Sequence, residues 1–347
     1  MIDLTNREAL AALDPKNVYG STEMFADQCQ QIIDDHFDIE LYTDAYKNSA
    51  NIVLCGMGGS AYGGYIAQSL FHDELQRPLM VNSDYHLPGF VNEQSLVLLS
   101  SYSGSTEEPL SCAEEAKVRK ANITGFSSGG ALAKLFPTQY PGFIFEPKHN
   151  PSGQPRLGTG YMSMGTIALL RQLGVISITK EEAQAAVQEV RANQEATKQQ
   201  AMAIAQQIQQ TIPVMFAAEH LGGNVHILRN QMNETAKSFA AYGELPELNH
   251  HFMEGLKYPQ DKKLTVIFIN SSHYSAHLQK RMALTKEVVS KNNIAWVEYQ
   301  AAGSTKLAQM LNVLSFGGYL SLFEAFIYGL DPSLIPWVDY FKEQLRQ

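Results

Sequence analysis

Short apolar runs alternate with longer segments of helical periodicity along the first half of the chain. Strands are predicted where these runs are bounded by polar or glycine-rich residues, at 51–55, 78–82, 95–100, 122–126 and 142–145. Apolar residues recur at helical spacing at 21–37, 65–71 and 160–173, whereas residues 1–20 are polar and are expected to form a loose arm. Strands that alternate with helices in this way predict an α/β fold with a doubly wound parallel sheet.

The same alternation returns in the second half, after a long polar helix. A capping box at 179–182 opens this helix, which is rich in alanine and glutamine to about residue 209 and is typical of a connector between domains. Further strands are predicted at 212–216, 264–269 and 294–299, and helices at 221–242, 307–330 and 337–345. We therefore expect two α/β domains, 1–178 and 179–347, each with a parallel sheet flanked by helices.

Composition narrows the kind of partner. The 347 residues are 45% hydrophobic and carry a net charge of −9, with no block of lysine or arginine, which argues against a nucleic-acid partner. Residues 1–4 lack the features of a signal peptide, and the apolar runs are too short for a membrane span, so we expect a cytoplasmic protein without a membrane partner. The three cysteines lack metal-ligand spacing.

The first candidate site is the glycine-rich stretch 56–64, which follows the strand at 51–55 and opens a helix. Glycine permits close backbone approach and positive φ, and the N–H groups at a helix start attract an anion, most often phosphate. Gly58, Gly59 and Ser60 are the candidate ligands. The stretch also fits a dinucleotide fingerprint, read from Gly56 to Ala61, and a tight turn without any ligand is the third interpretation.

A second candidate site follows the strand at 95–100. Ser101, Ser103, Ser105 and Thr106 place four hydroxyls within six positions, ahead of a helix that begins near Pro109. Simple N-capping by Ser105 or Thr106 needs only one hydroxyl, so the surplus favours a phosphate ligand. The carboxyl ends of parallel strands share one edge of a sheet, so both loops are expected to lie together.

Groups that could carry proton chemistry lie further along the chain. Glu234 and Lys237 share a helix face, where an exposed ion pair is the simpler interpretation. His250 and His251 lie beside carboxylates, but adjacent positions point apart, so one catalytic histidine is favoured over a metal site. Arg156 either clamps an anion or is an ordinary surface arginine.

Together these motifs resemble the sugar isomerase (SIS) superfamily, and within it the bifunctional phosphoglucose/phosphomannose isomerase family. The resemblance spans roughly residues 25–345 and depends on the order of five motifs, at 56–60, 101–108, 154–156, 233–237 and 246–250. It implies two SIS subdomains that work as a homodimer. The chain departs from the usual family pattern at Ser105, Tyr65 and His251, which leaves its substrate preference open.

The resemblance also implies roles for single residues. Ser60, Ser101, Ser103 and Thr106 would hold a sugar phosphate, and Arg156 would stabilise charge at the reacting end of the substrate. Glu234 would move a proton between C2 and C1, His250 would open the sugar ring, with the other subunit supplying it, and Lys342 matches a lysine near the C-terminus. The implied reaction is the isomerisation of glucose 6-phosphate, and of mannose 6-phosphate, to fructose 6-phosphate without cofactor or metal.

Two other functional classes remain. A phosphosugar-binding protein without catalysis would keep the serine loop but would need neither Glu234 nor His250. A dinucleotide-dependent oxidoreductase would use Asp84 for the ribose, but it leaves the loop at 101–106 without a role.

Overall fold

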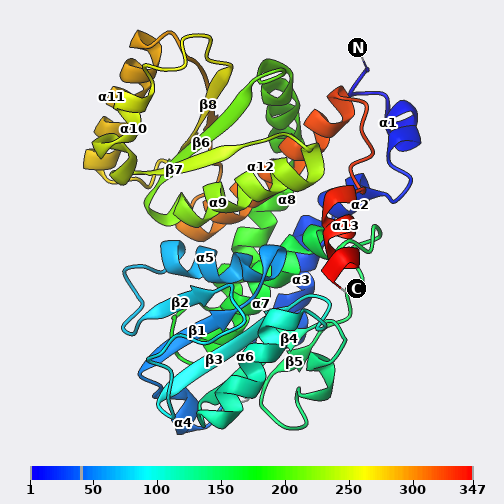
Figure 1. The fold of residues 1–347 in the computed structure, drawn as a ribbon, viewed down its shortest axis with the longest axis vertical. Helices are drawn as coiled ribbons and strands as arrows, with labels where there is room; N and C mark the ends of the chain where they lie inside the picture. Colours follow the sequence, from blue (N-terminus) through cyan, green and yellow to red (C-terminus); the bar gives the residue numbers. More distant parts are fainter. Residues whose placement is uncertain (1, 40–41, 346–347) are drawn as a thin grey trace.

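The computed structural model describes residues 2–39 and 42–345, and its strands form two parallel sheets (Figure 1). The first sheet has the order β2-β1-β3-β4-β5. Its strands are β1 (Asn51–Cys55), β2 (Leu79–Asn82), β3 (Ser95–Ser101), β4 (Asn122–Ser127) and β5 (Phe143–Ile144). Each residue of the central β3 is buried, as expected for a strand covered on both faces. All five strands predicted from the apolar runs are confirmed.

The second sheet has the order β7-β6-β8-β9. Its strands are β6 (Ile212–Ala218), β7 (Ala241–Leu245), β8 (Leu264–Asn270) and β9 (Ala295–Gln300). In sequence order, β6 to β9 follow the same path as β1 to β4, with β6 pairing with β8 as β1 pairs with β3. The fold class predicted from the sequence is confirmed, while the domain boundary at residue 178 stays a prediction.

Thirteen α-helices of the described residues surround and connect the sheets. They are α1 (Arg7–Leu13), α2 (Val18–Glu23), α3 (Phe25–His36), α4 (Asp44–Lys47), α5 (Tyr62–Leu70), α6 (Glu107–Val118), α7 (Thr159–Gln172), α8 (Lys180–Gln207), α9 (Gly222–Gln231), α10 (Phe252–Gly255), α11 (Ala276–Lys291), α12 (Lys306–Ile327) and α13 (Pro336–Leu345). Helices α5 and α9 pack against each other between the two sheets (Figure 1). The capping box of Thr179 and Glu182 opens α8 as predicted.

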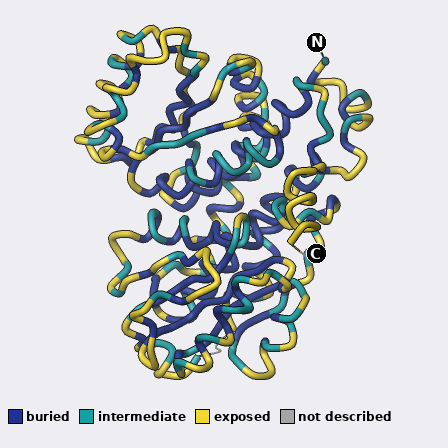
Figure 2. Tube along the Cα trace, viewed as in Figure 1, coloured by how far each residue is buried: buried dark blue, intermediate teal, exposed yellow. Residues whose placement is uncertain are grey.

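Helix α12 is the central helix of the core. By length and composition alone it could cross a membrane, but 89% of its most apolar window is buried inside the protein. It packs extensively against α8, and Figure 2 shows it as buried over most of its length. The apolar character of α12 is therefore explained by the core that it fills.

The prediction of a loose arm at residues 1–20 is wrong. Asn6 and Asn17 cap α1 and α2, and the Asp14 carboxylate accepts hydrogen bonds from the backbone N–H groups of Val18 and Tyr19. The ring of Tyr19 packs edge-on against Phe323 of α12, 6.1 Å between centroids. Asparagine and aspartate, which make the segment polar, thus serve as helix caps. The helix predicted at 21–37 is accordingly two helices, α2 and α3.

The prediction of one helix over 221–242 is also wrong in its extent, because the helix is shorter. It ends in a single π-helical turn, η5 (Met232–Ala236), and Lys237 then adopts a left-handed conformation with φ +53°. Such a backbone cannot continue a right-handed helix. The chain turns there and enters β7, the edge strand that the apolar pattern did not reveal.

Candidate active site

The glycine-rich stretch forms a short 3₁₀ turn, η1 (Gly58–Ala61), between β1 and α5. Gly58 has φ +49° and is exposed, a conformation that favours glycine. The Ser60 hydroxyl accepts a hydrogen bond from the backbone N–H of Tyr102 (3.0 Å), and the Ser100 hydroxyl donates to the Ser60 carbonyl (2.6 Å). The two loops predicted to meet at the carboxyl ends of β1 and β3 are therefore bonded to each other.

The serine loop divides its hydroxyls between two tasks. Ser101 and Thr106 hydrogen-bond to each other through their hydroxyls (3.0 Å), and Ser101 accepts from the backbone N–H of Gly104 (3.0 Å). Ser103 and Ser105 are exposed. Thr106 stands at the start of α6 but makes no capping hydrogen bond with its side chain. Simple N-capping therefore does not account for the loop, and its helix start is left open for an anion.

Gly104 holds this loop in shape, and we expect Gly104→Ala to destabilise the protein by about 2 kcal/mol. Its φ is +66°, and an added Cβ would collide with the backbone carbonyl of Gly129. Urea unfolding measures the loss. The matched control is Gly174→Ala, because Gly174 has φ +65° with open space around it and reports the backbone cost alone. Equal losses in the two variants would show that the packing against Gly129 contributes nothing.

Arg156 lies beside the glycine loop, in the 3₁₀ turn η3 (Pro155–Leu157). A Cβ on Gly59 would be 3.4 Å from the Arg156 Cα. The guanidinium donates to the carbonyls of Pro332 (2.9 Å) and Ser333 (2.8 Å), just before α13, and to the side chain of Gln154 (2.9 Å). The arginine is therefore partly buried and fixed in orientation, unlike an ordinary surface arginine. Its Nε has no partner among the described residues.

Glu234 lies in the π-helical turn η5 that ends α9. Burial raises the pKa of its carboxyl, while the positive charges of Arg156 and Lys342 act in the opposite direction. Lys237 does not pair with it, since its ammonium donates to the carbonyls of Thr235 (3.0 Å) and Asp331 (2.9 Å). π-Helical turns occur frequently at functional sites. Glu234 thus combines a raised pKa with a partly buried position beside positive charges, which is common among groups that exchange protons in catalysis.

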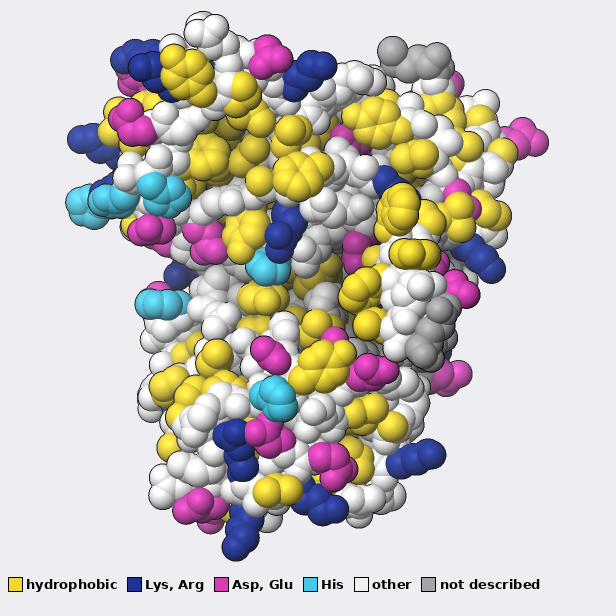
Figure 3. Space-filling model, viewed as in Figure 1, with side chains coloured by type: hydrophobic (Ala, Val, Ile, Leu, Met, Phe, Trp, Pro, Cys, Tyr) yellow, Lys and Arg dark blue, Asp and Glu magenta, His cyan; other side chains and the backbone are white. Residues whose placement is uncertain are grey.

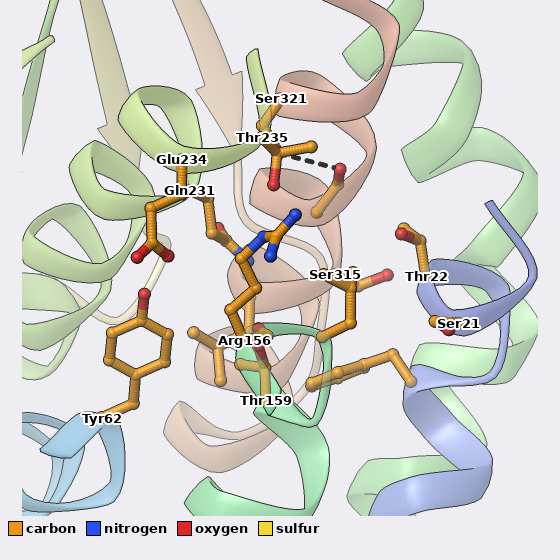
Figure 4. Close-up of a pocket in the computed structure, with 14 residues that line it drawn as sticks. Ser21, Thr22, Tyr62, Arg156, Thr159, Gln231, Glu234, Thr235, Ser315 and Ser321 are labelled. Atoms are coloured by element: carbon orange, nitrogen blue, oxygen red, sulfur yellow. Dashed lines mark hydrogen bonds between the residues drawn. The ribbon is translucent and has the colours of Figure 1, made fainter. Parts of the chain in front are cut away.

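Tyr62 is a site residue that the sequence reasoning missed. It is the first residue of α5 and is fully buried, and its hydroxyl points toward the Glu234 carboxyl in Figure 4. Burial first, and then the charge of Glu234, raise the pKa of this hydroxyl, so it stays protonated as a hydrogen-bond donor. One indication of this role was present in the sequence, since Tyr62 is an aromatic residue within the glycine-rich stretch 56–64.

A small cavity of about 30 Å³ lies next to Arg156 and Glu234 (Figure 4). Serine and threonine side chains from four parts of the chain line it, namely Ser21, Thr22, Thr159, Thr235, Ser315 and Ser321. A water molecule needs roughly 10–15 Å³ of such space, so the cavity has room for water but not for a sugar. A substrate must therefore bind on the solvent side of Arg156 and Glu234.

Two predicted site residues, Lys342 and His250, are less closely associated with Arg156, Glu234 and the two loops. Lys342 is exposed on α13, yet its charge acts on the Glu234 carboxyl, which places it at the same site. His250 is exposed at the end of the 3₁₀ turn η6 (Glu247–His250), beyond β7. It does not line the cavity of Arg156 and Glu234. One chain therefore brings together the two loops, Arg156, Glu234 and Lys342, but not His250.

Lys342→Gln is expected to shift the acidic limb of the pH profile of kcat/KM to higher pH. The lysine charge lowers the pKa of Glu234, so its removal lets burial raise that pKa further. The limb would be measured with saturating coupling enzymes between pH 5 and pH 8. Lys342→Arg keeps the charge and should leave the limb in place. A limb that stays or moves to lower pH in Lys342→Gln would contradict the electrostatic link.

Two parallel α/β units with a hydroxyl-rich loop beside a partly buried carboxylate define a protein of the SIS class. The chain aligns with the structure of tagatose-6-phosphate ketose/aldose isomerase from Escherichia coli with a TM-score of 0.68, covering 95% of this chain and 96% of the other at 15% identity, which shows the fold. Residues 197–345 match the family model of the bacterial phospho-glucose isomerase C-terminal SIS domain.

Sequence relatives identify the family. The chain is 30% identical over 298 residues to a bifunctional phosphoglucose/phosphomannose isomerase of Aquifex aeolicus, covering 85% of this chain and 90% of the relative. It is 28% identical over 326 residues to the protein of that name from Thermoplasma acidophilum, covering 92% and 97%. The chain belongs to the bifunctional phosphoglucose/phosphomannose isomerase family.

Proposed function

We propose that this protein is an aldose–ketose isomerase that interconverts glucose 6-phosphate and mannose 6-phosphate with fructose 6-phosphate. The observation that carries the proposal is the partly buried Glu234, whose carboxyl pKa is raised, beside Arg156 and the two hydroxyl-bearing loops. A phosphosugar-binding protein without catalysis would have no need of such a carboxylate.

The loops bind the phosphate. Backbone N–H groups at the starts of α5 and α6 favour an anion, and the exposed hydroxyls of Ser103 and Ser105 donate to its oxygens. Ser101 and Thr106 hold the loop shape through their mutual hydrogen bond, which leaves one of their two O–H groups free to donate. Ser60 ties the glycine loop, with Gly58 and Gly59, to the serine loop. Phosphate binding fixes the distant reacting carbons in position.

Glu234 transfers the proton. In the open-chain aldose, its carboxylate removes the proton from C2, and the C1 carbonyl oxygen gains a proton, which gives an enediol. The protonated Glu234 then returns its proton to C1 while the hydroxyl on C2 loses its proton, which gives the ketose. Arg156 and Lys342 offset the negative charge on the enediolate oxygens. Hydrogen moves within one molecule, so the reaction consumes no external oxidant.

His250 is assigned to ring opening, in the site of a second copy of the chain. Its imidazole is exposed and lies outside the cavity of its own Glu234, so a homodimer would supply it to the neighbouring site. Exposed aromatic residues support an association surface near the site. Trp337 is 81% exposed and Phe341 63% exposed on α13, where hydrophobic side chains gather in Figure 3. We place this enzyme in the cytoplasm.

A coupled assay of the purified protein tests the proposal. Both glucose 6-phosphate and mannose 6-phosphate should give fructose 6-phosphate, with rates that are unchanged by a metal chelator. Hydrogen exchange between C2 and solvent, followed by NMR in D₂O, would report the proton transfer directly. Binding of both sugar phosphates without turnover or exchange would favour the non-catalytic alternative.

A further inference from the structure

The second sheet repeats the elements that build the phosphate site of the first. A 3₁₀ turn, η4 (Glu219–Leu221), joins β6 to α9, as η1 joins β1 to α5. The first residue of each turn has nearly the same left-handed conformation, with φ +49° at Gly58 and φ +47° at Glu219. The two turns therefore begin with the same left-handed residue conformation, with glutamate in the place of glycine.

The loop that follows β8 also matches the serine loop that follows β3. Residues 102–106 lead from β3 to the start of α6, and residues 271–275 lead from β8 to the start of α11, so the two loops have the same length. Ser271, Ser272 and Ser275 carry hydroxyls in the second loop, and Ser275 takes the place of Thr106. These groups meet at the carboxyl ends of β6 and β8.

The antiparallel helices α5 and α9 extend the correspondence. Gly223 at the start of α9 donates its backbone N–H to Ser69 near the end of α5 (3.1 Å), while Tyr62 at the start of α5 interacts with Glu234 beyond α9. Asp73 follows the end of α5 as Glu234 follows the end of α9, and its carboxylate lies 3.7 Å from the ammonium of Lys306.

An open pocket of about 790 Å³ lies between these groups of the second half and helix α5 of the first half. Glu219, His220, Ser275, Asp73 and Lys306 are among the residues that line it. This volume exceeds that of the small cavity beside Arg156 and is sufficient for a small ligand.

One contact distinguishes the two halves. The Glu219 carboxylate accepts hydrogen bonds from the backbone N–H of Ser275 through both oxygens, each at 3.2 Å. In the first half, the corresponding N–H of Thr106 has no acceptor among residues 2–39 and 42–345. A carboxylate at a helix start provides the negative charge that a phosphate would otherwise provide. Its bonds also offset part of the cost of the left-handed conformation for a non-glycine residue.

We propose that the second half contains a latent phosphate site that Glu219 keeps closed by occupying the anion position with its own carboxylate. This inference rests on the proposed function, because it takes the first serine loop as a phosphate site. It explains why a glutamate occupies a strained backbone position. It also means that one chain binds one phosphate group, although its fold provides two such loops.

His220 supports a ligand position next to Glu219. Its side chain is almost fully buried (2% exposed), and its Nδ1 has no hydrogen-bond partner among the described residues. The other ring nitrogen, Nε2, lies 3.4 Å from both Gln309 Oε1 and the Ser271 hydroxyl. Burial lowers the pKa of His220 to about 4, so the ring is neutral. Gln309 Oε1 can only accept, so Nε2 carries the proton and the unpartnered Nδ1 is an acceptor, which suits the P–O–H group of a hydrogen phosphate.

Titration calorimetry with inorganic phosphate tests the proposal in wild type and in Glu219→Gly. Glycine keeps the left-handed backbone without strain and frees the Ser275 N–H, so the fitted stoichiometry should rise by one phosphate per chain. Glu219→Asn is the second variant, because asparagine tolerates this conformation and has a shorter, uncharged side chain. Glu219→Gln is the matched control, since its amide oxygen still reaches the Ser275 N–H and should add no phosphate.

Lys306→Ala in the Glu219→Gly background should remove the additional phosphate, because Lys306 is the cation that lines this cavity. Isomerase activity serves as the folding control, since Glu219 lies outside the cavity of Arg156 and Glu234. A gain of one phosphate over wild type supports the proposal. Wild type that binds no phosphate would contradict the proposed function, but it would leave the proposal of a latent site standing if the variant gains one. No gain in either variant, or two phosphates already bound by wild type, would overturn it.

Discussion

Glu234→Gln is expected to reduce kcat for the isomerisation of fructose 6-phosphate by at least about 10²–10⁴-fold, the typical contribution of a positioned base. The amide has the shape of the carboxyl but cannot accept and return a proton. The phosphate loops lie on other elements, so KM should change little. Steady-state kinetics measure both constants, and calorimetric titration with the sugar phosphate confirms that binding persists.

Glu244→Gln is the matched control for this variant. Burial also raises the pKa of the Glu244 carboxyl, but the residue lines the larger pocket between α5 and the second half. Glu244→Gln should therefore retain wild-type turnover. The comparison shows whether activity depends on the position of Glu234 or is lost whenever a carboxylate with a raised pKa is neutralised. Turnover near the wild-type rate in Glu234→Gln would sink the proposed mechanism. Equal losses in the two variants would point to a structural effect.

Most of the fold could be predicted from the sequence because the inner strands of both sheets are buried on both faces. Continuous apolar runs such as β3 and β8 are easily recognised in the sequence. A helix between one strand and the next predicts that the strands run parallel. β7 is an edge strand that is only half-buried and contains glycine and glutamate, so it has no such run. The helical periodicity before it carries no sign of the π-helical turn at Glu234 or of the left-handed Lys237.

The candidate site could be predicted only in part, for a different reason. Loops that follow strands in one sheet meet at a known edge, so the contact of Ser60 with the serine loop followed from topology. The position of Glu234 depends instead on how α9 of the second half packs on α5 of the first. The bonds from Arg156 to Pro332 and Ser333 join distant segments that no local spacing connects. His250 is exposed and does not line the cavity of Arg156 and Glu234, so its place in a second copy's site stays a proposal.

Glu324 provides a test of the core that is independent of catalysis. It lies in α12 with no solvent exposure, and its Oε1 accepts a hydrogen bond from the Ser238 hydroxyl (3.1 Å). Its Oε2 has no partner among the described residues. Burial raises the pKa of this carboxyl from 4.5 to about 7. A buried carboxylate without a cation is costly, so the folded protein holds the proton more tightly than the unfolded chain does.

The sign of the pH dependence follows from this difference. A carboxyl whose pKa is raised by folding stabilises the protein fully below about pH 4.5, and this contribution is lost as the pH rises through about 7. The loss amounts to about 3 kcal/mol, since one pKa unit corresponds to roughly 1.4 kcal/mol. Glu324→Gln removes the titration, so it should gain about that much free energy of unfolding relative to wild type between pH 5 and pH 8.

Urea unfolding of wild type and Glu324→Gln at pH 5 and pH 8, at one protein concentration, measures this gain. The exposed Glu254 provides the control, and Glu254→Gln should show the same pH dependence as wild type. If the stability difference between Glu324→Gln and wild type is the same at both pH values, Glu324 does not titrate in this range. The proton would then be absent from α12 in the folded protein, and another group near Ser238 would have to offset its charge.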